Sequence, residues 1–265
     1  MSKVNVLGVG VDPVDLGQAA DRIERALAGS IKCYVCVTGV HGVMEAQTNR
    51  QFRAILNRSL LTVPDGMPTV WVGKLQGFKK MERVYGPDLM SELCARSIEK
   101  GYTHFLYGGG PGVAEKLNQA LCARFPGIKI VGTHTPPFRP LSENELRDLQ
   151  HKVASIKPDL FWVGLSTPKQ EDFMARVGPD LAVKVMLGVG AAFDIHAGNL
   201  RDAPGWMKNC GLQWSHRLIQ EPKRLWKRYL LNNPRFLWKI TVQLLWAKGN
   251  ARSEQGSTFL PPQNS

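Results

Sequence analysis

The sequence has 265 residues, of which 43% are hydrophobic, and it carries a formal net charge of +12. This length allows one full hydrophobic core, or one core with a small appendage. The sequence contains no run of about 18 apolar residues, and its first residues are too polar for a secretory signal. We therefore expect a cytoplasmic protein without a membrane-spanning helix. The positive charge predicts an acidic partner: a membrane, a phosphate or a nucleic acid.

The cysteines and histidines show no pattern typical of metal ligands. Cys33 and Cys36 form a C-x-x-C motif, but residues three apart in a strand face opposite sides, and no second ligand pair accompanies them. We expect all five cysteines to be structural. The sequence also lacks an Asp-x-Asp motif, so it predicts no metal ion and no other cofactor. Arginine and lysine would have to neutralise any leaving phosphate.

Up to about residue 195, short β-rich segments alternate with amphipathic segments. Strands are expected at 4–9, 32–38, 60–63, 104–109, 128–133, 160–165 and 183–189. Helices are expected at 13–28, 87–100, 112–124, 142–155 and 168–176. Several of these strands are apolar on both faces, as buried parallel strands are. Residues 1–199 are therefore predicted to form a doubly wound, mostly parallel α/β domain of Rossmann-like architecture.

After residue 200 the sequence becomes rich in tryptophan and basic residues. Residues 201–250 contain ten lysines and arginines against two acids, so this fifth of the chain carries +8 of the net +12. We expect a helical, membrane-associating appendage over 200–249, with breaks at Pro222 and Pro234. The polar residues 250–265 are expected to form a disordered tail.

One face of the last predicted helix has a narrow polar stripe. Arg235, Lys239 and Gln243 recur every four residues, and apolar residues cover most of the remaining surface. Such a helix is too short and too interrupted to span a bilayer but suits the membrane interface. The alternative is a helix that docks on the α/β core or on another subunit.

The segment TVPDGMPTVW places one carboxylate, Asp65, after a strand-like run and before an apolar segment. One interpretation is an Asp-Gly turn whose aspartate caps the following helix. The other is a general base at the edge of the sheet, because ligands of doubly wound proteins bind beyond the carboxyl ends of the strands.

Other polar or glycine-rich segments fall at the same predicted edge. LYGGGPGVAE (106–115) is either a diphosphate-binding turn or a tight turn only, and it lacks the residues of a P-loop. In WVGLSTPKQE (162–171), helix capping explains Ser166 and Thr167 but not Gln170, for which we favour ligand contact. GVGAAFDIHAG (188–198) supplies Asp194, and MERVYGPDLM (81–90) supplies Arg83.

Together these segments resemble the WecG/TagA/CpsF family of bacterial glycosyltransferases, also called glycosyltransferase family 26. The similarity covers eight motifs in the order of the family, including VTGVHGV, IVGTHTPPF and RDAPGWM. It implies an inverting, metal-independent enzyme that transfers a sugar from a UDP-sugar to a polyprenyl-diphosphate-linked sugar. The reaction would serve bacterial surface polysaccharides, on the inner face of the cytoplasmic membrane. We also expect the protein to contact an anionic membrane surface and to associate with further copies of itself as a homo-oligomer.

The resemblance also implies roles for single residues. Asp65 matches the catalytic base. The substrate-binding positions are Thr38, Arg83, Gly109, Gln170, Asp194, Arg217, Arg224 and Lys227. The sequence departs from the family at Val40, where an asparagine is common, and at Pro136-Pro137-Phe138, where many members have Gly-Tyr-Phe. Both departures bear on which sugar is transferred.

Two other classes of protein were weighed. A Rossmann-type oxidoreductase needs a three-glycine fingerprint after its first strand, and residues 4–15 have glycine only at positions 8 and 10. A nucleic-acid-binding protein could use the basic, tryptophan-rich end. The aromatic residues there alternate with leucine and isoleucine at helical spacing, which suits a lipid surface better. We therefore expect no nucleic-acid partner.

Overall fold

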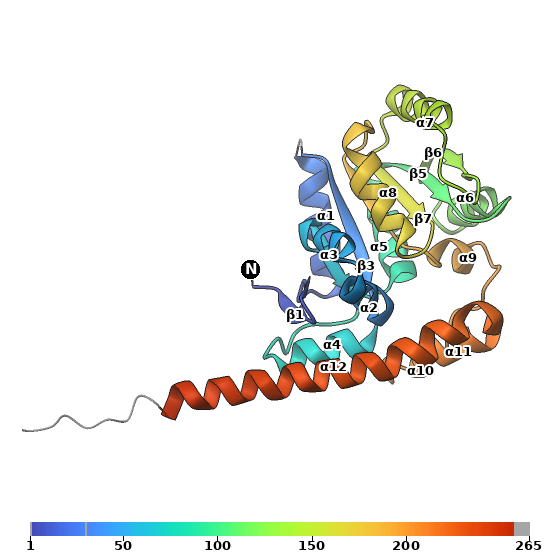
Figure 1. Ribbon diagram of the computed structural model, residues 1–265. Coiled ribbons are helices and arrows are strands. Elements are labelled where there is room, and N and C mark those ends of the chain that lie inside the picture. The colour runs from blue at the N-terminus through green and yellow to red at the C-terminus, as the bar shows by residue number, and fades with distance from the viewer. Residues whose placement is uncertain (1, 30, 257–265) are drawn as a thin grey trace, which may run out of the picture.

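The computed structural model describes residues 2–29 and 31–256. Its centre is a six-stranded parallel sheet with the order β4-β3-β8-β7-β5-β6 (Figure 1). The strands are β3 (Cys33–Thr38), β4 (Leu61–Pro64), β5 (Thr103–Gly108), β6 (Lys129–His134), β7 (Leu160–Gly164) and β8 (Val185–Gly188). They correspond to six of the seven expected segments, so the predicted α/β class is confirmed.

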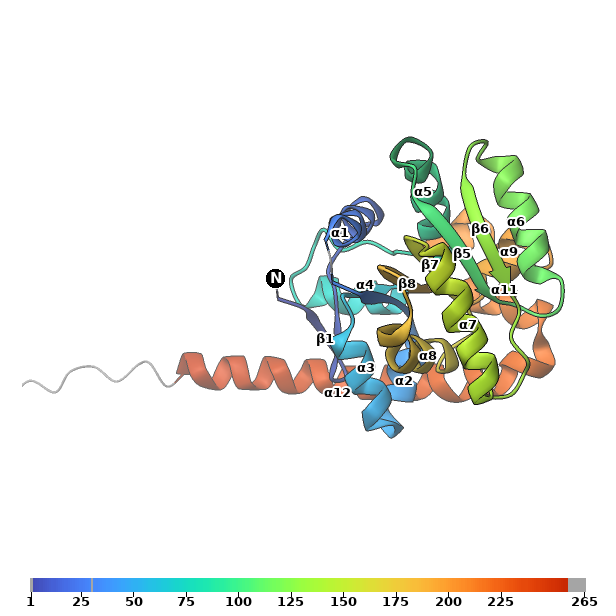
Figure 2. The same cartoon turned by 90° about the horizontal axis from the view of Figure 1, so that it is seen from above.

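Helices cover both faces of this sheet (Figure 2). One layer consists of α1 (Leu16–Ala28), α5 (Gly86–Lys100), α6 (Val113–Arg124) and α9 (Ala192–His196). The other consists of α2 (Val40–Thr48), α3 (Arg50–Arg58), α7 (Glu143–Ile156) and α8 (Lys169–Val177). Within β3, Val35 and Val37 belong to the first core while Cys36 belongs to the second. Successive strand residues thus face opposite layers, which is why the strands are apolar on both faces.

The expected first strand at 4–9 does not join the sheet. Residues 4–11 instead form an antiparallel hairpin of β1 (Val4–Val6) and β2 (Val9–Val11), in which Val6 pairs with Val9. Leu7 and Gly8 turn the chain with positive φ angles of 52° and 83°, as a two-residue hairpin turn requires. Leucine rarely adopts this conformation, so residues 7 and 8 carry no strong turn signal.

The residues after 200 form α10 (Gly205–Asn209), α11 (Gln213–Gln220) and α12 (Pro222–Gly256). The expected break at Pro222 is the start of α12, but the expected break at Pro234 is wrong, since the helix continues through it. A proline inside a helix costs about 3 kcal/mol. Phe236 and Ile240, just beyond it, are buried against the core that includes α2 and α8, and this packing offsets the loss. The helix also reaches Gly256, while residues 257–265 of the expected tail lie outside the described residues.

α12 has two unlike faces. Leu225, Phe236 and Ile240 are buried, whereas Trp238 and Trp246 are each 73% exposed. Further exposed apolar residues of this helix are Leu230, Leu231, Leu237, Val242 and Leu245. One side of α12 therefore packs on the α/β core, as the docking interpretation expects. Its other side presents exposed apolar residues, as the membrane-interface interpretation expects. Among the described residues, no helix is both long and apolar enough to cross a bilayer.

Gln243 does not belong to an outward polar stripe, contrary to expectation. Its side chain accepts a hydrogen bond from Leu7 N at 2.8 Å and donates one to Asn5 O at 2.8 Å. We call this contact the hairpin clasp. It holds the C-terminal half of α12, which extends past the α/β core on the side of β1 (Figure 2).

Candidate active site

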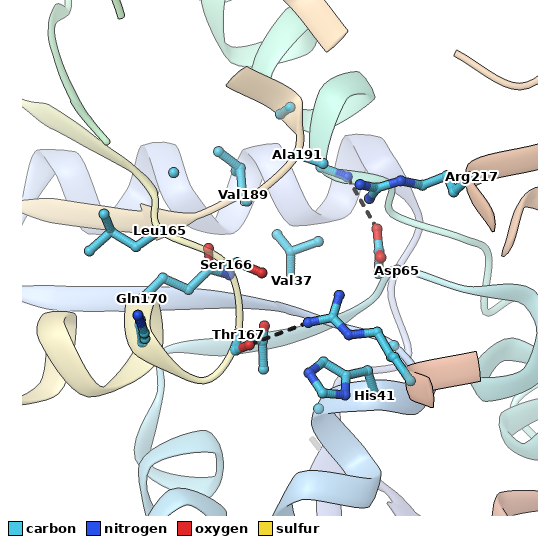
Figure 3. Close-up of a pocket in the computed structure, with 18 of the residues that line it drawn as sticks. Val37, His41, Asp65, Leu165, Ser166, Thr167, Gln170, Val189, Ala191 and Arg217 are labelled. Atoms are coloured by element: carbon cyan, nitrogen blue, oxygen red, sulfur yellow. Dashed lines mark hydrogen bonds between the residues drawn. The ribbon is translucent and has the colours of Figure 1, made fainter. Parts of the chain in front are cut away.

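A cavity of about 1150 Å³ lies at the carboxyl ends of the central strands (Figure 3). Loops that follow β3, β4, β5, β7 and β8 form one wall, which we call the core wall. Residues of α11 and α12 form the opposite one, the appendage wall. Sites for small molecules usually measure about 300–1,000 Å³, so this cavity is large for such a site.

Asp65 stands directly after β4 and lines the cavity. Its backbone N–H donates to Thr38 O at 3.1 Å, and its Oδ1 accepts from Gly86 N at 3.4 Å. The N-cap of α4 (Met67–Leu75) is Gly66, which makes no side-chain capping bond. The carboxylate therefore does not cap α4, and it accepts instead from Gly86, the first residue of α5.

The environment of Asp65 sets its acidity. Burial raises the pKa of this carboxyl, while the Arg83 and Arg217 guanidinium groups and the Gly86 N–H lower it, leaving a net increase. Figure 3 shows the Arg217 side chain pointing toward Asp65. A carboxylate whose pKa is raised toward neutrality is a better general base than an ordinary surface aspartate.

Arg83 and Thr38 support Asp65 from outside the cavity lining. Arg83 donates to Gln213 Oε1 of α11 at 2.8 Å and lies 4.6 Å from the centre of the Tyr85 ring. Thr38 is buried at the end of β3, and its carbonyl holds the Asp65 backbone. Neither lines the cavity, so any contact of these two residues with substrate remains a prediction.

Gly109, Gln170 and Asp194 do line the cavity, from the loop after β5, from α8 and from α9 respectively. Gly109 has a φ of +75°, and a Cβ there would lie 2.7 Å from the Val113 Cβ, so a side chain at this turn is excluded. Gln170, at the start of α8, is buried. The Asp194 carboxylate accepts from Asn199 Nδ2 at 3.3 Å. The structure thus brings these residues together with Asp65 at one edge of the sheet.

Two of the three predicted cations of the appendage line the cavity. Arg217 and Arg224 both donate to Glu221 Oε2, at 2.8 and 2.6 Å. One carboxylate therefore faces two guanidinium groups, which leaves an excess of positive charge. Lys227 is exposed outside the lining, with its Nζ 5.5 Å from the centre of the Trp226 ring.

Arg228 is the cavity residue that the sequence prediction missed. It lines the cavity and donates to Thr167 O at 3.5 Å. No carboxylate among the described residues lies within 4.0 Å of its guanidinium. Burial and the charges of Arg224 and Arg217 lower its pKa, because burial and nearby like charges both disfavour the charged form. A bound anion would relieve this repulsion. Its spacing of four residues from Arg224 was the available signal.

His41, on α2, was also missed, and the sequence held no signal for it. Burial and the charge of Arg228 lower its pKa to about 4, so the imidazole is neutral at pH 7. Its Nδ1 lies 3.3 Å from Asn232 Nδ2 of α12. The two departures from the family pattern, Val40 and Pro136 to Phe138, line the same cavity.

The arrangement therefore combines one carboxylate of raised pKa with several guanidinium groups across a cavity. Such a site can accept a proton on one side and stabilise negative charge on the other. Within residues 2–29 and 31–256, no three histidine, cysteine or acidic side chains gather as metal ligands would.

Comparison with known proteins agrees with this chemistry. The model of the glycosyl transferase WecG/TagA/CpsF family matches residues 4–250. A protein of Bacillus spizizenii is 31% identical over 184 residues, which is 69% of each chain. One of Bacillus subtilis is 31% identical over 183 residues, 68% of each chain. Both are named N-acetylglucosaminyldiphosphoundecaprenol N-acetyl-beta-D-mannosaminyltransferase. The chain belongs to the WecG/TagA/CpsF family and is a glycosyltransferase.

Proposed function

We propose that the protein transfers an N-acetylhexosamine from a UDP-sugar, with inversion, to a sugar carried on a polyprenyl diphosphate. The names of both relatives specify an acceptor sugar linked through a diphosphate to undecaprenol, and an N-acetylhexosamine as the transferred group. The product would enter the synthesis of a bacterial surface polysaccharide. The observation that carries the proposal is the pairing of Asp65 with arginines across one cavity.

Asp65 serves as the general base of this reaction. An acceptor hydroxyl oxygen attacks the anomeric carbon of the donor and forms the new glycosidic bond. The bond from that carbon to the phosphate oxygen breaks, and UDP leaves with the electron pair. The hydroxyl proton passes to Asp65. Attack on the face opposite to the leaving group inverts the configuration.

The arginines of the appendage wall stabilise the leaving diphosphate. Arg217 and Arg224 share one carboxylate, and Arg228 donates to the backbone carbonyl of Thr167. Guanidinium groups can bind phosphate oxygens through two hydrogen bonds each. Preorganised donors of this kind stabilise charge that develops in the transition state. The enzyme would then need no metal ion at the diphosphate.

The outward face of α12 supports contact with a membrane surface. It presents exposed tryptophans and leucines, and basic residues lie beside them on the same helix. Apolar side chains can enter the interface while lysine and arginine meet anionic lipid headgroups. The same helix lines the cavity with Arg228, so docking on lipid would bring the site to its lipid-linked acceptor.

The direct test is an assay of UDP release. The purified chain is mixed with single UDP-N-acetylhexosamines and a short-chain lipid-diphosphate-N-acetylglucosamine acceptor. We expect acceptor-dependent UDP release with one donor, and a product of inverted anomeric configuration by NMR. A chain that releases no UDP with any of the donors, or that retains the configuration, would refute the proposed reaction.

A further inference from the structure

Buried polar atoms without a partner concentrate at one place beside the cavity. Among the described residues five buried side-chain atoms lack a hydrogen-bond partner. Three of them are Thr38 Oγ1, Gln170 Oε1 and Glu171 Oε2, which lie at the end of β3 and the start of α8. Unsatisfied buried polar groups are costly and rare, so a cluster of them calls for a functional explanation.

Glu171 lies behind the cavity rather than in its lining. Its side chain is buried, and Oε1 accepts hydrogen bonds from Thr167 Oγ1 at 2.8 Å and from Gln170 Nε2 at 3.1 Å. Thr167 and Gln170 both line the cavity, whereas Glu171 does not. One carboxylate oxygen thus fixes the rotamers of two cavity residues, which Figure 3 shows on the same loop and helix start.

The same cluster reaches Thr38 across the start of α2. A Cβ added to Gly42 would lie 2.9 Å from Thr38 Cγ2 and 3.8 Å from Thr167 Cγ2. The two threonine side chains therefore flank one point, and only glycine leaves room there. Hydrogen bonds join Glu171 to Thr167 and Gln170, and the Thr38 methyl group approaches the same point beside Gly42 as that of Thr167.

Stability does not account for a carboxyl group at this position. No lysine, arginine or histidine nitrogen of the described chain forms an ion pair with Glu171. Burial raises its pKa to about 7; the neighbouring Asp172 raises it too, while the bonds from Thr167 and Gln170 lower it. The Cys36 thiol of β3 also faces it. Burying a carboxyl group that has no ion-pair partner costs free energy, which an apolar side chain of similar size would not.

We propose that Glu171 is a positioning residue, which holds the Thr167 hydroxyl and the Gln170 amide in the orientation that the nucleotide donor requires. This inference rests on the proposed function, because it takes the ligand of the core wall to be a UDP-sugar. Glu171 itself does not touch the donor and acts only through its two neighbours.

Two substitutions separate positioning from packing. Glu171→Leu keeps the approximate size but removes the acceptor, whereas Glu171→Gln keeps an acceptor oxygen. We expect Glu171→Leu to fold and to bind UDP about tenfold more weakly than the wild type in calorimetry. Glu171→Gln should recover most of the affinity. Thr167→Val, which leaves Glu171 in place, should weaken UDP binding by itself, and Glu171→Leu should add little to it.

His104→Leu is the matched control. His104 is a buried polar residue of β5 outside the cavity lining, with an unpartnered Nε2 and a bond from Trp162 Nε1. Its replacement should lower thermal stability and leave UDP affinity unchanged. Unchanged affinity in Glu171→Leu or Thr167→Val overturns the inference, as do additive losses in the double variant. If the wild type binds UDP but transfers no sugar, the proposed function fails while the affinity series still tests Glu171.

Discussion

The core wall and the appendage wall of the cavity differ in construction and in charge. The core wall consists of short loops, each fixed by a buried parallel strand, and it carries the carboxylate of Asp65, the base that we propose. The appendage wall consists of helices, and it supplies Arg217, Arg224 and Arg228. Under the proposed function, proton acceptance and stabilisation of phosphate charge would therefore fall to separate parts of the chain. Each can be removed while the other remains.

The largest effect is expected from Asp65→Asn in the core wall. The amide cannot accept the proton, so turnover should fall about 10²- to 10⁴-fold. Asn keeps an oxygen for the Gly86 N–H, and the residue does not cap α4, so UDP affinity and the melting temperature should change little. Steady-state kinetics, calorimetry and thermal unfolding measure the three quantities. Near-normal turnover in the folded variant would contradict the assignment of the base.

In the appendage wall, Arg228→Ala should lower kcat/KM about 10- to 100-fold, since a charge-assisted hydrogen bond to phosphate is lost. Lys227→Ala is its control, because the adjacent lysine is exposed outside the cavity. That variant should stay within about twofold of the wild type. Equal losses in both variants would mean that general surface charge, rather than contact with the diphosphate, is responsible.

The outer side of α12 is tested by Trp238→Ser combined with Trp246→Ser. Both side chains are 73% exposed, so the fold should be kept while partitioning onto anionic liposomes falls roughly tenfold. Activity on a short-chain acceptor in solution should persist. Ile31→Ser is the control, because Ile31 is 79% exposed at the opposite, amino end of β3. If the double variant sediments with liposomes as well as the wild type does, α12 is not the lipid contact.

A smaller effect is expected from Arg83→Met, and it appears in the pH profile. Arg83 lowers the pKa of Asp65, so its removal raises that pKa further. The base is active when deprotonated, and activity is lost as the pH falls through its pKa. The acid limb of kcat/KM should therefore move to higher pH in the variant. An acid limb that stays in place would show that Asp65 does not govern this limb.

The smallest effect is expected from chelation. If arginines alone neutralise the diphosphate, EDTA should leave the rate within experimental error. Loss of activity that Mg²⁺ or Mn²⁺ restores would instead assign part of the appendage wall's role to a metal ion.

The core wall could be predicted from the sequence because its signals are local. Each buried strand is a short apolar run, and the polar residue that follows it must lie at the common edge of a parallel sheet. Asp65, Gly109 and Gln170 could be located in this way. The buried partner of Gln170, Glu171, could not, because its role depends on which way one side chain of α8 turns.

The appendage wall could not be predicted to the residue. Lys227 and Arg228 are neighbours, and successive side chains on a helix point about 100° apart. Which of them faces the cavity depends on how α12 docks, and Phe236 and Ile240 decide this through contacts with distant parts of the core. The continuation of the helix through Pro234 has the same tertiary origin.

The hairpin clasp has a consequence for the order of folding. Gln243 and Leu7 are 236 residues apart, and contacts of such separation form late because a long loop must first close. Domains fold from the N-terminus during synthesis, so the hairpin can exist long before the helix that it holds. The hairpin clasp can therefore form only after the chain has been synthesised as far as Gln243. Until that point, a nascent chain would lack the clasp that holds α12, the helix on which we propose that arginines bind the diphosphate.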